Sequence, residues 1–600
     1  MDEMKRIRSR EEIPEEDKWA IEDLYATDAA WEEDLKTVAD DQEYLASFAG
    51  KLADPRQLYD YLHRSEELNT KADRLGNYCM RKADEDTRNA TYQAMQGRFM
   101  SVFVALGAAT SFDTPEIMSI SDEDMDRFYR EYPALERYRR YLTNLRRMKA
   151  HTLSAAEEKL LAAAGEMADA PDSIYGAFAD ADLTFPDAVD SKGEKHPLTQ
   201  GTFVPLEEST DRILRKSAYE NLYDSFAAFK NTAAATLNAQ NKQLKFFAEA
   251  RKYENAFERS LDRTNVPTSV YLNLIEAVHN NVDKMHRYVR LRKKLLGVDQ
   301  LHFYDIYTPL VADADRKIPY GEAKQTIYDA LHPLGEDYRA ILKEGFENRW
   351  IDVYQNTGKR SGAYSAGAQV HPFVLMNYSG TLDSQFTLAH EMGHAIHSYL
   401  SNKHQKAIDA DYVIFVAEVA STCNEALLME YLLGKTTDKK ERAYLINHFL
   451  DQFKGTIYRQ TMFAEFELNI GRLVAEGQTL TAEVLCAEYK RLNELYYGPD
   501  MVVDDRIAME WARIPHFYYN YYVFQYATGY SAAIALSRRI LAEGETAVKD
   551  YLNFLSGGCS KSPIDLLKGA GVDMTSPAPV NQALELFGQL LDEMEALMEE

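Results

Sequence analysis

The sequence predicts a mainly α-helical protein, and two observations support this prediction. Apolar residues recur with helical spacing through long stretches, the clearest being 212–261, 439–453 and 532–555. Only 18 of the 600 residues are proline, so few of these patterns are interrupted. No low-complexity linker or internal repeat divides the chain, and we therefore expect one large helical body.

The pattern changes most clearly between residues 183 and 205. This stretch contains three of the prolines, together with glycine and short apolar runs, and it is typical of short strands and turns. Helical patterns lie on both sides of it. We therefore predict a helical N-terminal region over residues 1–205 and a second region over residues 206–600.

Composition and charge narrow the possible partners. The formal net charge of −27 opposes a nucleic-acid role, because phosphate binding requires a basic surface. The charged N-terminus lacks the apolar core of a secretion signal, and the apolar run at 100–111 is too short to span a bilayer. The four cysteines are far apart and form no C-x-x-C pair, which favours free thiols in a reducing compartment. We expect a cytoplasmic protein without a nucleic-acid or membrane partner.

Residues 383–400 carry the most informative motif. They include H-E-x-x-H, formed by His390, Glu391 and His394, in a pattern that predicts a helix beginning after an N-cap at Asp383. Positions four apart on a helix differ by only about 40°, so both imidazoles project from one face. Two neutral imidazoles on one face can hold a zinc ion, one per chain, and Glu391 can act as the general base beside the water that zinc activates.

A third metal ligand has to come from elsewhere in the chain. The metzincin pattern is excluded, because His397 stands where that pattern has glycine and Leu400 where it has histidine. A second helical pattern at 415–434 carries Glu418 and Glu425, seven residues apart and therefore on one face. A carboxylate in so apolar a helix is costly to bury unless it is paired or bound to metal.

Two aspartates are weaker candidates for the same role. Asp409 and Asp411 fall in the polar connection before the second helix, where solvated turn residues are expected.

Upstream of the motif, residues 370–378 form an extended apolar run in which Pro372 suits an edge strand. An edge along Phe373 to Tyr378 could hold a peptide by main-chain hydrogen bonds, although an ordinary sheet edge explains the run equally well.

Residues 511–530 contain six tyrosines and one histidine. This composition predicts a buried aromatic helix, because the neighbouring phenylalanines and valine must face a core. The alternative is catalytic. Zinc-assisted hydrolysis of a peptide bond forms an oxyanion, and phenol or imidazole donors can stabilise it.

With these motifs the chain resembles the oligoendopeptidase F family of zinc peptidases, relatives of thimet oligopeptidase and neurolysin. The resemblance extends over roughly the last two thirds of the chain, in the expected order, in the blocks 358–364, 375–382, 386–398, 415–422 and 515–529. It implies Glu418 as the third zinc ligand and leaves Glu425 to orient a ligand histidine through its other ring nitrogen. It also implies a helical body that encloses a deep substrate channel, a small β-sheet near the zinc site, and a catalytic region over 206–600.

The resemblance also gives the aromatic segment a role. Family members bring a histidine and tyrosines from this region to the zinc, which implies catalytic roles for His516, Tyr519, Tyr522 and Tyr526. The tyrosine spacing differs from that of thimet oligopeptidase, and an offset of one residue would bring in Tyr521 instead.

The sequence therefore predicts a zinc endopeptidase that hydrolyses internal bonds of short, unstructured peptides by Glu391-assisted attack of zinc-bound water. One alternative is an exopeptidase of the dipeptidyl carboxypeptidase type, which would need a group such as Arg513 to bind a free terminus. A second is a zinc-containing protein that only binds peptides, which is disfavoured because a binder has no need of Glu391. The natural peptides and the oligomeric state stay open.

Overall fold

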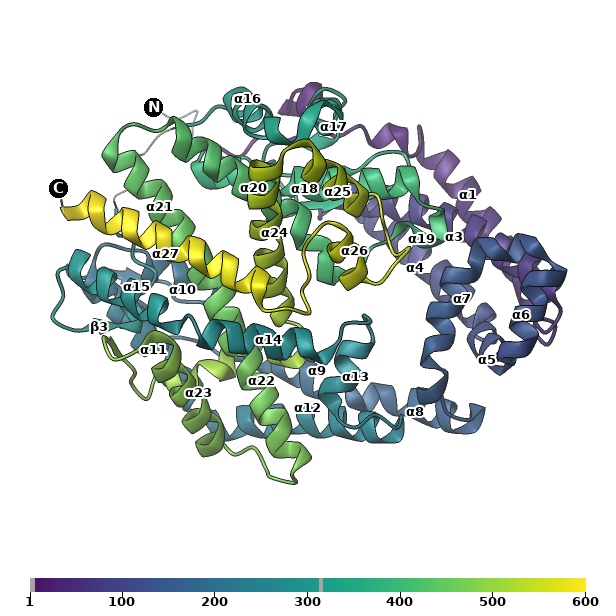
Figure 1. The fold of residues 1–600 in the computed structure, drawn as a ribbon, viewed down its shortest axis with the longest axis horizontal. Helices are drawn as coiled ribbons and strands as arrows, with labels where there is room; N and C mark the ends of the chain where they lie inside the picture. The colour runs from purple at the N-terminus through teal and green to yellow at the C-terminus, as the bar shows by residue number, and fades with distance from the viewer. Residues whose placement is uncertain (1–5, 312–316, 600) are drawn as a thin grey trace. The chain divides into compact units, whose positions relative to one another are not determined.

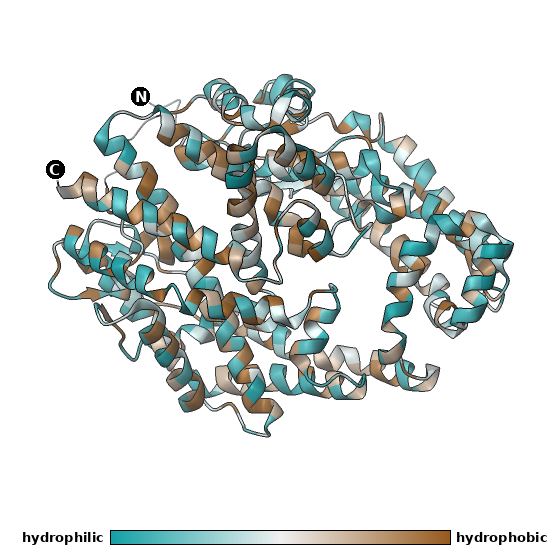
Figure 2. Cartoon of the chain, in the orientation of Figure 1, coloured by the Kyte–Doolittle hydropathy of each residue, from teal (hydrophilic) through white to brown (hydrophobic). Residues whose placement is uncertain are grey.

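The computed structural model describes residues 6–311 and 317–599 (Figure 1). Helices make up 72% of the chain, and this confirms the mainly α class. The strands in the described ranges are short and form two two-stranded sheets and one three-stranded sheet. Figure 2 shows hydrophobic and hydrophilic residues on different sides of many helices, the arrangement that lets one face of a helix pack on a core.

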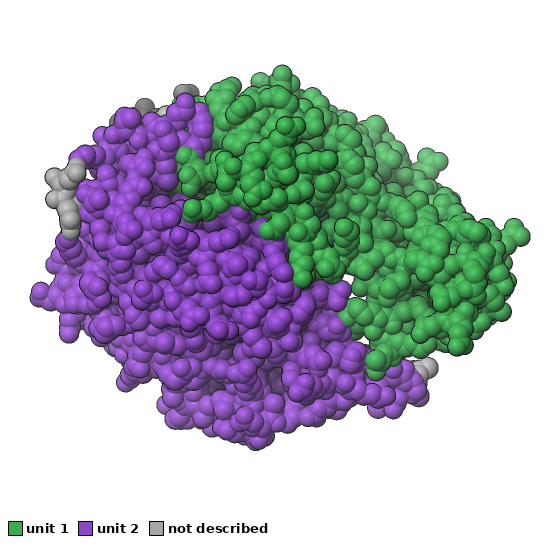
Figure 3. All heavy atoms as spheres, viewed as in Figure 1, with its two compact units in different colours: residues 1–150, 316–430, 536–571 green, residues 151–315, 431–535, 572–600 purple. Residues whose placement is uncertain are grey.

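The chain forms two compact units, and each unit combines segments that are far apart in sequence (Figure 3). Unit 1 contains residues 1–150, 316–430 and 536–571. Unit 2 contains residues 151–315, 431–535 and 572–600. The division predicted at residue 205 concerns the order of regions along the chain, and it stays a prediction.

Unit 1 holds most of the motif-bearing elements. Its helices and strands are α1 (Asp28–Asp40), α2 (Gln42–Ala46), α3 (Pro55–Glu85), α4 (Ala90–Thr110), α5 (Asp113–Ser119), α6 (Asp122–Glu131), α7 (Arg139–Arg146), α16 (Tyr320–Ala330), α17 (Gly335–Glu347), β4 (Ile351–Asp352), β5 (Tyr364–Ala366), β6 (Phe373–Leu375), α18 (Leu382–His404), α19 (Ala407–Ala410), α25 (Glu545–Leu555) and α26 (Pro563–Gly569). Helices α20 (Ile414–Lys435) and α24 (Phe524–Glu543) begin in one unit and end in the other.

Unit 2 is also helical. Its elements are α8 (Ala155–Ala168), α9 (Ala170–Gly176), β1 (Ala188–Val189), β2 (Lys195–His196), α10 (Gln200–Glu207), α11 (Arg212–Ala227), α12 (Lys230–Ala250), α13 (Ala256–Asp262), α14 (Thr268–His279), α15 (Val282–Leu295), β3 (Leu301–His302), α21 (Lys439–Phe453), α22 (Arg459–Ala475), α23 (Ala482–Tyr497), β7 (Met501–Val502) and α27 (Ala578–Glu599). Strands β1 and β2 form an antiparallel hairpin, which confirms the strands and turns predicted between residues 183 and 205.

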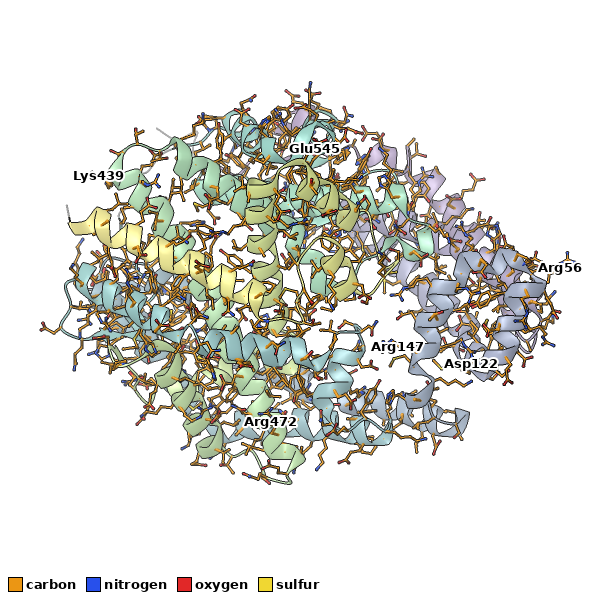
Figure 4. All side chains as sticks on the ribbon, viewed as in Figure 1. Arg56, Asp122, Arg147, Lys439, Arg472 and Glu545 are labelled. Atoms are coloured by element: carbon orange, nitrogen blue, oxygen red, sulfur yellow. The ribbon has the colours of Figure 1, made fainter. Side chains whose placement is uncertain are left out.

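The hydrophobic core of unit 1 joins the N-terminal helices to the sheet that precedes the motif helix. Helix α3 starts after the N-cap Asp54, whose carboxylate accepts two backbone N–H groups, and it has proline at its first position. One face of α3 packs with the two N-terminal tryptophans, Trp19 and Trp31. Phe373 and Leu375 of β6 belong to the same core. Charged side chains such as Arg56 and Asp122 lie on the outside (Figure 4).

The three-stranded sheet corrects one expectation. Its order is β4-β6-β5, with β6 parallel to β4 and antiparallel to β5. The strand expected at an edge, beginning at Phe373, is therefore central, and β5 is an edge of the sheet. Pro372 lies just before β6, where its missing N–H removes no hydrogen bond from the ladder.

The motif helix is longer than predicted. It begins one residue before Asp383, and the N-cap is Thr381, whose hydroxyl accepts a 3.1 Å hydrogen bond from the N–H of Ser384. Asp383 instead lies in the first turn, where a negative charge is favourable. Gly434, where the second predicted helix ends, lies inside α20. Among the described residues, no helix is long and apolar enough to cross a membrane.

Candidate active site

The two motif helices, α18 and α20, approach each other very closely. A Cβ added to Gly393 would lie 2.5 Å from Cα of Ser421, so only glycine fits at this crossing. Asn424 of α20 is fully buried, and its amide donates a 3.0 Å hydrogen bond to the carbonyl of Ala389 on α18. Tyr338 of α17 donates to the other side of the same amide at 2.7 Å. These contacts fix the spacing of the helices that carry the motif.

The crossing brings together His390, His394 and Glu418. Nε2 of His390 lies 3.2 Å from Nε2 of His394 and 3.3 Å from Oε2 of Glu418, and the remaining edge, from His394 to Glu418, is 3.5 Å. Zinc held tetrahedrally at about 2.0–2.1 Å places its ligand atoms about 3.3 Å apart. The triangle therefore fits a tetrahedral metal ion with its fourth position open, and the three residues form a group that could hold one.

Glu425 holds one of the histidines in place. Its Oε1 accepts a 2.6 Å hydrogen bond from Nδ1 of His390. This bond fixes the ring so that Nε2, the other nitrogen, faces Glu418 and His394. A carboxylate on the far side of a ligand histidine sets its tautomer and raises its basicity. The contact expected of Glu425 is thus present.

Glu391 is buried beside this group and is not a corner of the triangle. Its side chain is 7% exposed, and Oε2 has no hydrogen-bond partner among the described residues. Burial raises the pKa of Glu391, although His390 and His394 partly oppose the rise. An unpaired buried carboxylate oxygen is costly. Its position next to a metal group suits a proton acceptor whose partner is water or substrate.

The other histidines near the motif have packing roles. His397 is fully buried and stacks on Tyr412 at 3.7 Å between ring centroids. Burial, together with the neighbouring His394, lowers the pKa of His397 to about 3, so its ring is neutral. His371 stacks on Trp350 and contacts Asp23 at 3.1 Å. Neither histidine belongs to a potential metal-binding group of the described residues.

The weaker ligand candidates also lie outside the triangle. Asp409 is buried and Asp411 is exposed, and neither is part of a potential metal-binding group within the described ranges. A second possible group, Asp190, Glu194 and His196, lies on the β1–β2 hairpin of unit 2. There Asp190 already accepts the backbone N–H groups of residues 192 and 194, which makes it a turn residue.

The aromatic segment belongs to unit 2 up to Ala535. The buried helix expected from its composition is wrong for residues 511–523, which form two 3₁₀ turns and a loop, and α24 begins only at Phe524. Asn520 and Tyr521 have φ angles of 60° and 61°, in the left-handed region that non-glycine residues rarely adopt. The amide of Gln240 supports this bend by donating to Asn520 Oδ1 at 2.8 Å.

The four aromatic candidates form one chain of ring contacts, in which His516 contacts two of the tyrosines directly. The centroid of its ring lies 5.4 Å from that of Tyr519 and 6.0 Å from that of Tyr526, and Tyr522 lies 5.3 Å from Tyr526. Tyr519 is 48% exposed. Burial lowers the pKa of His516, so the ring is neutral near pH 7 and one nitrogen can donate a hydrogen bond.

Tyr521 has a different role. It is 5% exposed, and its hydroxyl occupies the space that a Cβ on Gly471 would need. Its backbone N–H donates to Glu467 at 3.0 Å. Tyr521 is therefore a packing residue. If the tyrosine assignment were shifted by one residue, the buried ring of Tyr521 would replace the more accessible ring of Tyr522.

Arg513, the group that an exopeptidase would use, is also engaged within unit 2. Its guanidinium lies 4.7 Å from the ring of Phe203 and donates to the hydroxyl of Tyr223 at 3.4 Å. Tyr223 in turn donates to the buried carboxylate of Glu510 at 3.2 Å. These contacts hold the guanidinium of Arg513 against the core of unit 2.

A mainly α fold with H-E-x-x-H on one helix and a glutamate from a second helix packed against it defines the metallopeptidase class. Comparison with known proteins gives the family: a profile of peptidase family M3 matches residues 205–586, and one named Oligopeptidase F matches residues 116–185. The chain belongs to family M3 and to its oligoendopeptidase F group, and it is a peptidase with peptide substrates.

The relatives match the chain over nearly its whole length. Oligopeptidase PepF of Bacillus subtilis is 45% identical and covers 99% of this chain, which in turn covers 89% of that protein. The crystal structure of oligoendopeptidase-F from Enterococcus faecium is 38% identical, with a TM-score of 0.76 over 95% of this chain and 99% of that one. A solved protein from Chlamydophila abortus reaches a TM-score of 0.93 at 36% identity, over 99% of this chain and 100% of that one.

Proposed function

We propose that this peptidase is a zinc endopeptidase that cuts internal bonds of short, unstructured oligopeptides. His390, His394 and Glu418 would hold the ion, and the near-equilateral triangle of their ligand atoms is the observation that carries the proposal. When bound, zinc supplies a Lewis acid that polarises a carbonyl and lowers the pKa of water. Glu425 keeps Nε2 of His390 directed at the ion by holding Nδ1.

Glu391 is the proposed general base. Its unpaired carboxylate oxygen accepts a proton from the attacking water and later gives that proton to the leaving amine. A buried carboxylate with a raised pKa can perform both transfers, because it is a stronger base than a solvated one. This role separates a hydrolase from a protein that only binds peptides.

The aromatic cluster is proposed to stabilise the oxyanion of the tetrahedral intermediate. His516, Tyr519, Tyr522 and Tyr526 are the candidate donors, and the neutral state of His516 and the exposure of Tyr519 support this role. Donors of this kind act by binding the transition state more strongly than the substrate. Tyr521 is excluded from the proposal because its ring is buried against Gly471.

The preference for short peptides is proposed from the relatives, whose names describe oligopeptidases and oligoendopeptidases. A deep substrate channel between helical walls would admit an extended peptide and exclude a folded domain. A helical region over 1–205, a catalytic region over 206–600 and a cytoplasmic location complete the proposal.

The decisive experiment on the base is Glu391→Gln. The variant should retain one zinc per chain and lose peptide hydrolysis by about a hundred- to ten-thousandfold, the range for losing a general base. Glu347→Gln on α17 is the matched control, because Glu347 is exposed and has only a 3.8 Å ion pair with Lys343. A zinc-free Glu391→Gln protein would show that Glu391 is a metal ligand instead of the base.

A digest of matched substrates tests endopeptidase action and substrate size. One peptide is supplied free, blocked at both termini, and embedded in a stably folded protein that is also tested after unfolding. We expect cutting of the first two and of the unfolded protein, little cutting of the folded protein, and inhibition by phenanthroline. Failure on the blocked peptide would identify an exopeptidase, and efficient cutting of the folded protein would exclude a size-limiting channel.

A further inference from the structure

Unit 1 contains a cavity of about 960 Å³ that the proposed chemistry does not use. Helices α3 and α4 form one side of it, and β5 with residues 398–412 forms the other. Its lining includes Asp73, Met100, Phe103, Ser365, Ser398 and Asp411. A cavity of this volume is in the range of sites that bind organic ligands.

The cavity reaches the helix that carries the metal group. Ser398 follows His394 by one turn on the same face of α18, and it lines the cavity. Its hydroxyl is 2.9 Å from that of Tyr412, and a Cβ on Gly367 would lie 3.0 Å from the Ser398 side chain. Ser365 belongs to β5, an edge strand of the sheet. A peptide passing the metal group along this helix would therefore have the cavity within reach of its neighbouring residues.

The lining of the cavity is acidic. It includes Glu66, Asp73, Asp113 and Asp411 but no lysine, arginine or histidine. Glu66 pairs with Arg137, and Asp113 accepts a hydrogen bond from a tyrosine hydroxyl. Asp73 and Asp411 are left without an ion pair among the described residues. Both are exposed residues, and Asp73 accepts a 3.0 Å hydrogen bond from the side-chain amide of Asn77.

The opposite wall is apolar. Residues 99–112, which include the second half of α4, contain no charged side chain. Met100 and Phe103 line the cavity and are each 46% exposed. Ser65 and Ser365 also line it, and their buried hydroxyl oxygens have no hydrogen-bond partner among the described residues. Exposed apolar groups opposite carboxylates that lack an ion pair suit a ligand with an aliphatic part and a cationic end.

We infer that this cavity binds a cationic group of the peptide substrate, either a lysine or arginine side chain or a free N-terminal ammonium, with Asp73 and Asp411 as its counter-charges. The inference rests on the proposed peptidase site and adds a preference to it. A bare metal ion fits less well. Asp73 and Asp411 do not belong to any group of three potential ligands in the described ranges, and a divalent ion requires more oxygen donors than two.

The test uses peptides that differ only in charge. An internally cleaved peptide is made with arginine or its neutral analogue citrulline at each position around the cut, and with a free or acetylated N-terminus. At one position, or at the N-terminus, the cationic form should have a kcat/KM about ten- to a hundredfold higher, the range for a hydrogen bond to a charged group. A preference for arginine at one position would identify a side chain as the bound cation, and a preference for the free N-terminus would identify the terminal ammonium.

The variants locate the preference. Asp73→Asn combined with Asp411→Asn should bring the ratio for charged and neutral peptides close to one and leave the neutral peptide almost unaffected. Asp60→Asn is the matched control, because Asp60 lies on α3 outside the cavity and has only a 3.9 Å pair with Arg56, which Figure 4 labels. No preference at any position in the native enzyme, or the same preference in the double variant, would overturn the inference.

Binding measured without turnover separates this inference from the proposed reaction. Fluorescence anisotropy of dye-labelled arginine and citrulline peptides on the Glu391→Gln protein should show the same ratio, and the two aspartate changes should abolish it. Equal affinity for the two peptides would overturn the inference whatever the reaction is. A zinc analysis of the double variant should give the native content, because neither aspartate touches the metal group.

Discussion

The metal group and the aromatic segment are built in different ways. His390, His394 and Glu418 lie on two uninterrupted helices, α18 and α20, whose crossing is set by Gly393. The backbone of residues 511–523 instead forms two 3₁₀ turns and a loop, and its φ angles are left-handed at Asn520 and Tyr521. The spacing of side chains on a regular helix is constant, whereas in an irregular segment each backbone turn redirects the next side chain.

The difference shows what each region can tolerate. In the helix pair the positions of the ligands follow from helix geometry, and the weak point is the close contact between the helices. In the aromatic segment two adjacent tyrosines, Tyr521 and Tyr522, have different surroundings, because the bend turns one ring into the core. Loss of a metal ligand in the first region should therefore abolish activity, whereas loss of one side chain in the second should only reduce it.

The largest expected effect is that of Glu418→Ala. Removing one of three metal ligands should empty the site and abolish peptide hydrolysis. Glu425→Ala should keep the metal but weaken its affinity by about ten- to a hundredfold, because Glu425 only orients His390. Zinc content after dialysis measures both. A zinc-loaded Glu418→Ala protein beside a zinc-free Glu425→Ala protein would reverse the two roles.

In the aromatic segment, His516→Ala should lower kcat by about ten- to a thousandfold with a smaller change in KM, as for one lost oxyanion donor. Phenylalanine substitutions of Tyr519, Tyr522 and Tyr526 should each reduce kcat less, since each removes a single hydroxyl. Tyr521→Phe is the comparison, because its hydroxyl is buried against Gly471. A Tyr521→Phe enzyme with the largest loss of kcat among the tyrosine variants would contradict the assignment.

A smaller effect is expected at the helix crossing. Gly393→Ala places a methyl group 2.5 Å from Cα of Ser421, and relieving this overlap should cost about 1–3 kcal/mol and weaken zinc binding. Gly434→Ala in α20 is the control, since nothing lies within 4 Å of its added Cβ. That change should stabilise the helix slightly. Thermal unfolding measures both changes. Equal melting temperatures for the Gly393→Ala and Gly434→Ala proteins would mean that the helix crossing is not tightly packed.

The last effect appears only as a change in pH dependence, and it concerns Glu467, which supports the bend at Asn520 and Tyr521. Glu467 accepts the N–H of Tyr521, and burial raises its pKa to about 8. A carboxyl with a folded pKa above its unfolded value binds its proton more strongly in the folded state, so it reduces stability as the pH rises from about 4.5 to about 8. Glu467→Gln should flatten this part of the pH dependence of Tm, by about a few degrees at pH 8.

Glu476→Gln is the matched control for this change, because Glu476 is exposed at the end of the same helix, α22. It should leave the pH dependence of Tm unchanged. If Glu467→Gln and the native protein lost the same amount of Tm between pH 5 and pH 8, Glu467 would not be the buried titrating group.

The sequence by itself determined the features that depend on helical periodicity. The mainly α class, the two motif helices and the shared face of His390 and His394 follow from the 3.6-residue repeat, which acts over a few residues. The seven-residue spacing of Glu418 and Glu425 placed both on one face as well. Family resemblance then favoured Glu418 for the metal, and Glu425 lies on the opposite nitrogen of His390.

Only the tertiary structure decided the features that depend on contacts between distant segments. The predicted edge strand beginning at Phe373 is central because β4 and β5 flank it, and no local pattern reveals a strand's neighbours. The burial of Tyr521 depends on Gly471 and Glu467, about fifty residues earlier in the chain. Asp73 and Asp411 line one cavity although more than 300 residues separate them. Such contacts arise from packing of the whole chain, whereas a sequence pattern records only the geometry of its own helix or strand.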